Sequence, residues 1–376
     1  MRAMSAIMDS TDAGVLAGRR LPQPGASAQG NPTPRIQHAG FVRSVERAEP
    51  NPSNLSVNTG VGSMLAKCIA RALPKSAALF LHSPCPAPAR RGRAKRGNMI
   101  SKAELQQRIV QTVRDVRETN PMAGSITNTV TVNFVANAQI AAGGSAAMVY
   151  LPDEGEFLAN AGWATYLNMG TLLPVYEETI PRTAQTLHEL RRPWVLDPVG
   201  IGIGSLRTRL LAQLKEYKPT IIRGNASEVI ALASLWEIAT EATAYVRGVD
   251  STQGVGEARS AAIALARYTG GAVAVSGVDD LVTDGVMVAR SHGGSHFMAK
   301  ITGSGCSLGG VAAVYATMAP SPFTAALTAV NAFNLAGTRA EKRVDAPGSF
   351  QVAFLDELYK ASAEDIARNS FDLEEA

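Results

Sequence analysis

From about residue 120 onward, short apolar runs alternate with longer segments in which apolar residues recur every three or four positions. The short runs lie at 147–150, 166–169, 194–196, 219–222 and 272–275. The longer segments lie at 154–161, 179–190, 206–217, 226–235 and 257–268. Buried strands that alternate with amphipathic helices predict an α/β sandwich with a mostly parallel central sheet.

Two further patterns extend this prediction. Ser101 and Glu104 form a capping-box pattern at the start of a predicted helix that runs to Arg117. Asp284-Gly285 separates two apolar runs at 281–282 and 286–288, which is typical of a hairpin.

The most distinctive local feature is a glycine-rich run at 302–310, followed by a predicted helix over 311–318. Such a turn aims free backbone N–H groups at one point in front of the helix dipole, which favours an anion such as phosphate. A tight turn that allows close helix packing explains the same residues equally well. The Gly-Lys-Ser/Thr ending of a P-loop is absent from the sequence, which excludes that class of nucleotide site.

Two residues of this run are candidates for chemistry. Cys306 is predicted to lie in the first helical turn, where a thiol has a lowered pKa and is available as a base or nucleophile. A buried apolar role is the alternative for Cys306. Gly305 is expected to allow close approach of a phosphoryl group and to adopt unusual backbone angles.

Polar residues follow three of the predicted strands, at the sheet edge where α/β proteins bind ligands. Asp197 follows one strand, Arg223-Gly224-Asn225 the next, and Ser276 a third. Glu228, one turn into the following helix, could hold Mg²⁺ directly or through water, and Arg223 could bind phosphate oxygens. Capping by Asn225, with Glu228 complementing the helix dipole, is the simpler explanation of those two residues taken alone.

Charge divides the 376-residue chain into two parts. Residues 1–98 carry 14 Lys and Arg against 4 Asp and Glu, together with 10 of the 20 prolines, whereas residues 99–376 carry 22 against 28. Because this spacing of prolines interrupts helices and sheets, we predict a basic, disordered extension over 1–98 and one folded α/β domain over 99–376.

The basic run at 89–96 could bind nucleic acid, but a solvated charge run is the favoured reading, and nucleic acid is not expected as a partner. The extension has the acid-poor, Arg- and Ser-containing composition of transit peptides. We favour a third reading, in which Met99 is the true start of translation.

Other classes of protein fit the sequence less well. No stretch of 18 residues is unbroken by polar side chains, so a membrane is not expected as a partner. Three cysteines are too few for a disulfide framework, so we expect a cytoplasmic protein. His292 and His296 are separated by Gly293-Gly294, which argues against a helical two-histidine zinc site. A cysteine hydrolase that combines Cys306 with one of them is also disfavoured.

Seven motifs together resemble those of hydroxyethylthiazole kinases. In order they are Ile126-Thr127-Asn128, Met148, Asn168-Met169-Gly170-Thr171-Leu172, Leu196-Asp197-Pro198-Val199, Ile222-Arg223-Gly224-Asn225-Ala226-Ser227-Glu228, Val282-Thr283-Asp284-Gly285 and Gly303-Ser304-Gly305-Cys306. With Gly348-Ser349-Phe350 and the segment from Phe354 to Tyr359, the resemblance covers roughly residues 105–362.

The resemblance implies a ribokinase-like three-layer sandwich and Mg·ATP-dependent phosphorylation of 4-methyl-5-(2-hydroxyethyl)thiazole in thiamine salvage. It further implies a homotrimer with the thiazole site at a subunit boundary. By motif, Met148 and Gly303 would contact the thiazole, and Arg223 and Ser276 would contact ATP. Asp197 and Glu228 would bind Mg²⁺ and its water. Cys306 would occupy the position of the catalytic base.

Two departures from the family are visible: the 98-residue extension, and Ser276 where many members have Thr, although either hydroxyl can serve the same hydrogen bond. A hydroxymethylpyrimidine-type kinase of the same superfamily is the alternative enzyme. Cys306 in place of Asp and the segment around Met148 argue against it. A catalytically inactive thiazole-binding protein is a second alternative, and the intact Arg223, Glu228 and 303–306 run argue against that.

Overall fold

The computed structural model describes residues 100–239 and 251–376, with the side chains of 251–256 left aside. The predicted extension over 1–98, including Cys68, Cys85 and the basic run, lies outside the described residues. Within the described residues, no helix combines the length and the apolar character that crossing a membrane requires.

One sheet runs through this part of the chain, in the strand order β2-β1-β3-β4-β5-β6-β7-β8-β9. The strands are β1 Met122–Ile126, β2 Ser145–Met148, β3 Ala164–Asn168, β4 Trp194–Asp197, β5 Ile221–Asn225, β6 Ala272–Ser276, β7 Asp280–Thr283, β8 Met287–Ser291 and β9 Phe371–Glu375. Strands β1 to β6 pair in parallel, and β7, β8 and β9 continue the sheet antiparallel.

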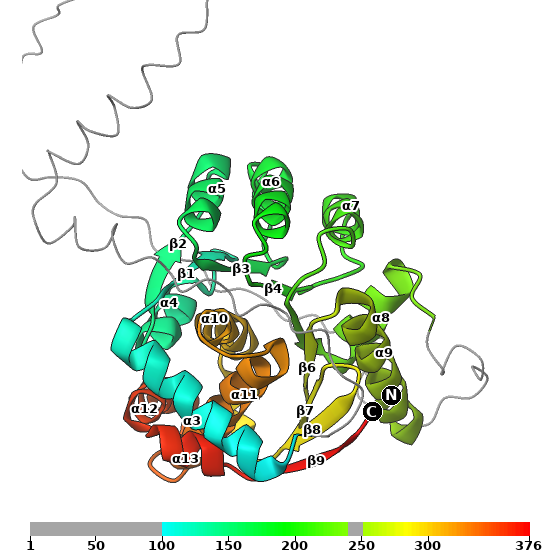
Figure 1. Cartoon of the computed structure of the whole chain (residues 1–376). Coiled ribbons are helices and arrows are strands. Elements are labelled where there is room, and N and C mark those ends of the chain that lie inside the picture. The colour runs from blue at the N-terminus through cyan, green and yellow to red at the C-terminus, as the bar shows by residue number, and fades with distance from the viewer. Residues whose placement is uncertain (1–99, 240–250) are drawn as a thin grey trace, which may run out of the picture. The chain divides into compact units, whose positions relative to one another are not determined.

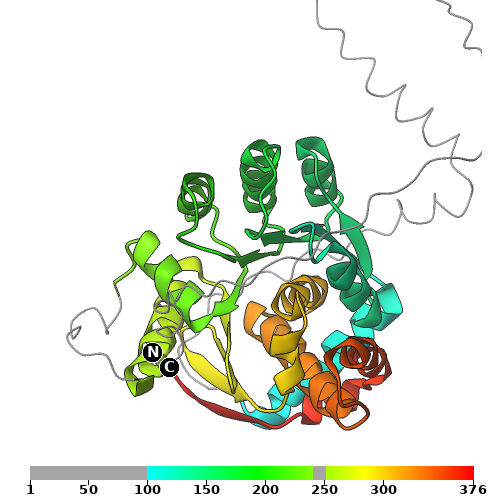
Figure 2. The ribbon, with the colours of Figure 1, turned by 180° about the vertical axis from the view of Figure 1, so that it is seen from behind.

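Helices cover both faces of this sheet, which makes three layers (Figure 1). On one face lie α5 Pro152–Asn160, α6 Tyr176–Glu189, α7 Ser205–Leu214, α8 Ala226–Leu235 and α9 Ser251–Thr269. On the other lie α3 Lys102–Thr119, α4 Val132–Ala141, α10 Ser304–Ala316, α11 Pro322–Glu341, α12 Pro347–Lys360 and α13 Ala363–Arg368. The same separation is visible from behind (Figure 2). The predicted α/β sandwich with a mostly parallel sheet is therefore confirmed.

Alternation along each strand produces two separate hydrophobic cores. In β4, Val195 packs toward α10 and its neighbours, whereas Trp194 and Leu196 pack toward α6 and α7. In β5, Ile221 and Ile222 divide in the same way. Strands that are buried on both faces explain why the sequence shows continuous apolar runs here rather than alternation of apolar and polar residues.

Most predicted elements are confirmed with shifts of a few residues. The helix predicted from Ser101 is α3, where the Ser101 side chain accepts a hydrogen bond from the Glu104 backbone N–H. β5 runs from Ile221 to Asn225, two to three residues later than predicted. Residues 223–225, which were predicted to follow the strand, are therefore its last three residues. The predicted hairpin is β7–β8.

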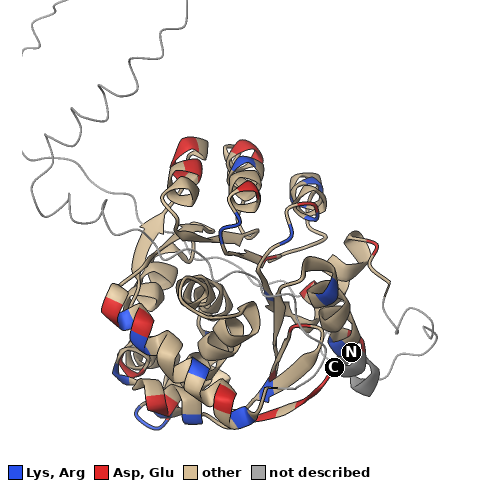
Figure 3. Ribbon diagram, viewed as in Figure 1, with Lys and Arg blue, Asp and Glu red and all other residues tan. Residues whose placement is uncertain are grey.

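The helix begins at Ser304, so it includes most of the glycine-rich run as well as the predicted segment from Val311, and Cys306 lies in its first turn as predicted. The glycines inside α10 are present for packing: a Cβ on Gly309 would lie 2.3 Å from Tyr166 Cε2, and one on Gly310 would lie 2.8 Å from Val135 Cγ1. α10 carries no charged residue, whereas α3, α5 and α6 present charges along their lengths (Figure 3). α10 is therefore held close against the centre of the sheet.

Candidate active site

A buried polar cluster lies at the carboxyl ends of the central strands. Asn168 and Asp197 are direct neighbours in the β3–β4 register, and Asn225 and Ser276 are neighbours in the β5–β6 register. Asp197 is fully buried, and Arg223, from the strand beside it, is 8% exposed. The parallel register thus brings together three of the residues predicted from separate parts of the sequence: Asp197, Arg223 and Ser276.

Arg223 connects the two sides of this cluster. Its Nη1 lies 3.4 Å from Asp197 Oδ2, and its Nη2 donates a 2.9 Å hydrogen bond to Ser276 Oγ. The guanidinium lies directly against α10, because a Cβ on Gly305 would be 2.5 Å from both Nη1 and Nη2. Arg223 therefore places a positive charge beside the positive end of the α10 dipole.

The first turn of α10 supplies unpaired donors to the same place. Helical geometry leaves the N–H groups of Ser304, Gly305 and Cys306 without intrahelical acceptors, and the ladder begins when Ser307 N–H donates to Gly303 O at 2.8 Å. A guanidinium and free amides at one point favour an anion with several oxygens.

Cys306, the third residue of α10, is contacted by two asparagine amides. Asn168 Nδ2 is 3.3 Å and Asn128 Nδ2 is 3.6 Å from the Cys306 Sγ. The orientation of the Asn168 amide is fixed, because its Oδ1 accepts the Gly170 backbone N–H at 2.9 Å. Tyr166 completes the cluster by donating a 2.8 Å hydrogen bond to Asp197 Oδ2.

Comparison with known proteins gives a consistent result. Residues 113–364 match the model of the hydroxyethylthiazole kinase family. A hydroxyethylthiazole kinase from Bifidobacterium longum is 50% identical over 284 residues, which cover 70% of this chain and 90% of the relative. A hydroxyethylthiazole kinase from Akkermansia muciniphila is 38% identical over 273 residues, which cover 72% of this chain and 98% of the relative.

This chain belongs to the hydroxyethylthiazole kinase family. The solved structure of a hydroxyethylthiazole kinase protein from Pyrococcus horikoshii OT3 agrees with this, with a TM-score of 0.63 and 28% identity, covering 72% of this chain and 99% of that one. The resemblance inferred from the motifs is confirmed.

The remaining predicted residues lie on α10, on α8 and on the edge strand β2. Gly303 is the N-cap of α10 with φ +90°, and a Cβ there would lie 2.7 Å from Thr131 Cγ2. Met148 ends β2, the edge strand, and is half-buried. Glu228 and Asn225 form a reciprocal capping box at the start of α8, with the Asn225 N–H donating to Glu228 Oε2 at 2.9 Å. The capping explanation of Glu228 is thus realised, and its free carboxylate oxygen leaves a metal role open.

The structure corrects the predicted state of the Cys306 thiol. Burial raises the pKa of Cys306, and the charge of Asp197 raises it further, although Arg223 and the Asn168 amide act in the opposite direction. The prediction of a lowered pKa from the helix N-terminus was wrong, because the thiol is buried beside a carboxylate. Burial beside Asp197 therefore favours the neutral form of the Cys306 thiol.

The Asp197 carboxylate has an oxygen that could bind a ligand. Burial raises the pKa of Asp197 to about 6, with Arg223 and the Tyr166 hydroxyl lowering it. Its Oδ1 is buried and finds no hydrogen-bond partner among the described residues. An unpaired buried carboxylate oxygen is costly, and a cation held directly or through water would satisfy it.

Sequence reasoning missed the roles of Asn128, Asn168 and Tyr166. The two asparagines were part of the family motifs, but they received no function. The available signal was their position, because each stands at the end of an apolar run, as Asp197 does.

Both histidines lie away from the thiol. The ring of His292 contacts Asp279 and Asp372, and that of His296 contacts Glu341. A cysteine hydrolase that pairs Cys306 with either of them has no support in these contacts.

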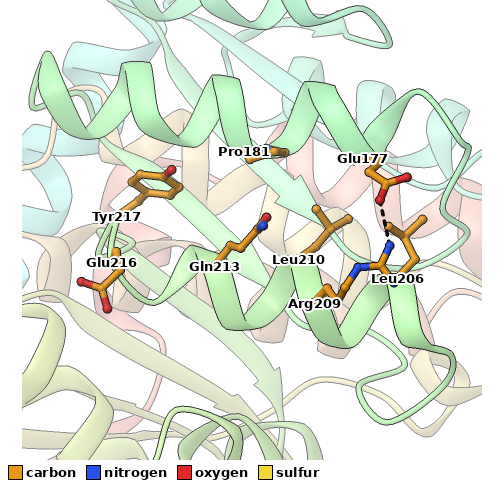
Figure 4. Close-up of a pocket in the computed structure, with 8 residues that line it drawn as sticks. All are labelled: Glu177, Pro181, Leu206, Arg209, Leu210, Gln213, Glu216 and Tyr217. Atoms are coloured by element: carbon orange, nitrogen blue, oxygen red, sulfur yellow. Dashed lines mark hydrogen bonds and ion pairs between the residues drawn. The ribbon is translucent and has the colours of Figure 1, made fainter.

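A groove of about 350 Å³ lies elsewhere, between α6 and α7. Glu177 and Arg209 form a 2.7 Å ion pair at one end of it, and Tyr217 lines the other end (Figure 4). None of the predicted site residues lines this groove, so the carboxyl-end cluster is the candidate active site.

Gly305→Val should lower kinase activity by on the order of 10²-fold or more, the range seen when one preorganised donor is lost. Unusual backbone angles at Gly305, which the sequence led us to expect, are not the reason for this loss. Gly305 is helical, and Gly303 is the residue with a left-handed φ. A Cβ at Gly305 would displace the Arg223 guanidinium. Activity and far-UV circular dichroism should be measured together.

Gly348→Val is the matched control for this substitution. Gly348 occupies the same second position of a helix, α12, and has nothing within 4 Å of its virtual Cβ. Equal activity of the two variants would remove the role assigned to the Arg223–Gly305 contact.

Proposed function

We propose that this protein transfers the γ-phosphoryl group of ATP to the hydroxyl of 4-methyl-5-(2-hydroxyethyl)thiazole, a step of thiamine salvage. The contact of Arg223 with the first turn of α10 carries this proposal, since it places a guanidinium and three free amides at one point. Phosphoryl transfer passes through a loose transition state, so positioning and charge neutralisation provide most of the catalysis.

Arg223 and Ser276 are proposed to bind the nucleotide. Nη2 of Arg223 donates to Ser276 Oγ at 2.9 Å and Nη1 faces Asp197 Oδ2 at 3.4 Å, which leaves the other N–H groups of the guanidinium for phosphate oxygens. Arg223 Nε is buried without a partner among the described residues, which is expected of a group that completes its bonds with a ligand. The backbone amides of α10 would hold the transferring group in line with the acceptor.

Asp197 and Glu228 are proposed to hold Mg²⁺, through oxygens or through its waters. Mg²⁺ is commonly bound by one or two carboxylates together with substrate phosphates rather than by a closed protein site. The unpaired Oδ1 of Asp197 fits that description. When bound, the ion would neutralise charge on the phosphates and would lower the pKa of Asp197 below its value of about 6.

Cys306 is proposed to stand beside the attacking hydroxyl as a weak base or as a packing group. A neutral thiol tolerates an apolar aromatic substrate more readily than a carboxylate does, because burying an unpaired carboxylate costs more. Gly303 and Met148 are proposed to contact the thiazole. Met148 lies on the edge strand, half-buried, and a second subunit could complete the site there. A homotrimer and a cytoplasmic location remain predictions.

Phosphorylation of hydroxyethylthiazole and hydroxymethylpyrimidine by the purified protein with Mg·ATP tests the proposal directly. We expect the thiazole to be the better acceptor by kcat/KM. A preference for the pyrimidine would establish the alternative kinase, and turnover of neither would support an inactive binding protein.

Cys306→Ala should lose about 10²-fold or less in rate with thiazole binding preserved, because a loose transition state requires little deprotonation of the alcohol. Cys306→Asp should remain active, since Arg223 and the α10 N-terminus oppose the unfavourable effects of burial and of Asp197 on a carboxylate at this position. Cys306→Ser, which keeps a small hydrogen-bonding group, is the control. A folded, thiazole-binding Asp variant without activity would contradict the base-position assignment.

Light scattering should give about three times the subunit mass. The family resemblance implies a homotrimer, and Met148 at the sheet edge is the position where a second subunit would complete the thiazole site. A monomer with full activity would refute this arrangement and the role of Met148.

A further inference from the structure

His292 lies between two carboxylates from different parts of the chain. Its Nδ1 is 2.7 Å from Asp279 Oδ1, and its Nε2 is 3.0 Å from Asp372 Oδ2. Asp279 belongs to the turn between β6 and β7, and Asp372 belongs to β9. The imidazole thus joins that turn to the last strand of the sheet.

The chemistry of these contacts selects one protonation state. An ionised carboxylate only accepts hydrogen bonds, and a neutral imidazole has one N–H donor. Both contacts are satisfied together only when His292 carries two N–H groups and is therefore an imidazolium. In agreement, the hydrogen bonds to Asp279 and Asp372 raise the pKa of His292 above its ordinary value.

The turn held by His292 is the one that carries a proposed nucleotide ligand. Ser276, whose hydroxyl accepts from Arg223, is the last residue of β6. The turn closes when Gly277 N–H donates to Asp280 Oδ1 at 3.0 Å. The His292 side chain holds Asp279 of this turn from outside it, through the contact of its Nδ1 with Asp279 Oδ1.

We propose that His292 is a positioning residue for nucleotide binding, which holds the β6–β7 turn and Ser276 in place through its two carboxylate contacts. This inference rests on the proposed function for the identity of the ligand. His292 itself touches no proposed substrate group and acts through Asp279. The clamp is present below the folded pKa of His292 and is lost as the pH rises through it.

The charged groups around His292 come from the β6–β7 turn and from strands β7, β8 and β9. Asp279 comes from the turn, Asp280 from β7 and Asp372 from β9, and Arg290 comes from β8, which ends just before His292. Glu374 of β9 is paired with Arg259 of α9 at 3.3 Å. Behind the loop, α11 contributes the neutral side chains of Asn334 and Thr338.

KM for Mg·ATP, measured from about pH 6 to pH 9, tests the proposal on the full chain. Wild-type KM should rise with pH, on the order of tenfold, because a misplaced ligand weakens binding and alignment. His292→Ala should show the raised KM at every pH, with kcat changed less. His292→Arg can donate to both carboxylates at every pH and should keep the low KM throughout. His296→Ala, which alters the other histidine of this segment, is the matched control and should follow the wild type.

Hydrogen exchange of residues 276–280 and calorimetry with Mg·ATP alone give readouts without turnover. In His292→Ala, we expect faster exchange of these residues and weaker Mg·ATP binding, whereas His292→Arg should match the wild type in both. If hydroxyethylthiazole is not the acceptor but these results hold, the proposed function fails and the role of His292 stands. Unchanged KM, affinity and exchange in a folded His292→Ala would overturn the proposal. Wild-type protein that binds no Mg·ATP would overturn both.

Discussion

The ion pair between Asp197 and Arg223 is the constraint on which the site depends. Both groups are buried, and their nearest atoms lie 3.4 Å apart, so each charge has lost most of its hydration. Removing one partner of such a pair typically costs about 3–5 kcal/mol, because the other is left buried and uncompensated. The pair is incompletely satisfied by the protein, since Asp197 Oδ1 and Arg223 Nε have no partner among the described residues. Under the proposed function, a phosphate and its cation would complete the network at these two atoms.

The fold supplies this arrangement through the sheet and α10. The parallel register brings polar strand ends to one edge, and the glycines of α10 allow the helix to approach until its backbone touches Tyr166 and Arg223. The helix tolerates this buried position because it carries no charged side chain. The cationic guanidinium at its N-terminus is held by Asp197 and Ser276 against the repulsion of the helix dipole. Positive charge at this point is therefore preorganised for an anion before any ligand arrives.

The sequence predicted the parts of the structure that depend on local pattern. Strands buried on both faces appear as apolar runs, and the residues at their ends, Asp197, Arg223 and Ser276, were correctly expected to converge. The position of β9 and the packing of α11 to α13 depend on distant contacts and were not predicted. The Cys306 pKa was predicted in the wrong direction, because helix position is visible in a sequence while burial beside Asp197 is not. For the same reason Gly305 was assigned an unusual backbone angle, when its real constraint is a guanidinium from another strand.

A crystal structure with a non-hydrolysable ATP analogue, Mg²⁺ and hydroxyethylthiazole tests the central claim most directly. The account predicts that the terminal phosphate lies between the Arg223 guanidinium and the amides of residues 304–306, with the ion on the side of Asp197 and Glu228. The thiazole hydroxyl should approach that phosphate from the side of Cys306. The account would be contradicted if the phosphates were bound elsewhere, for example in the groove between α6 and α7, while Arg223 contacted only Asp197 and Ser276.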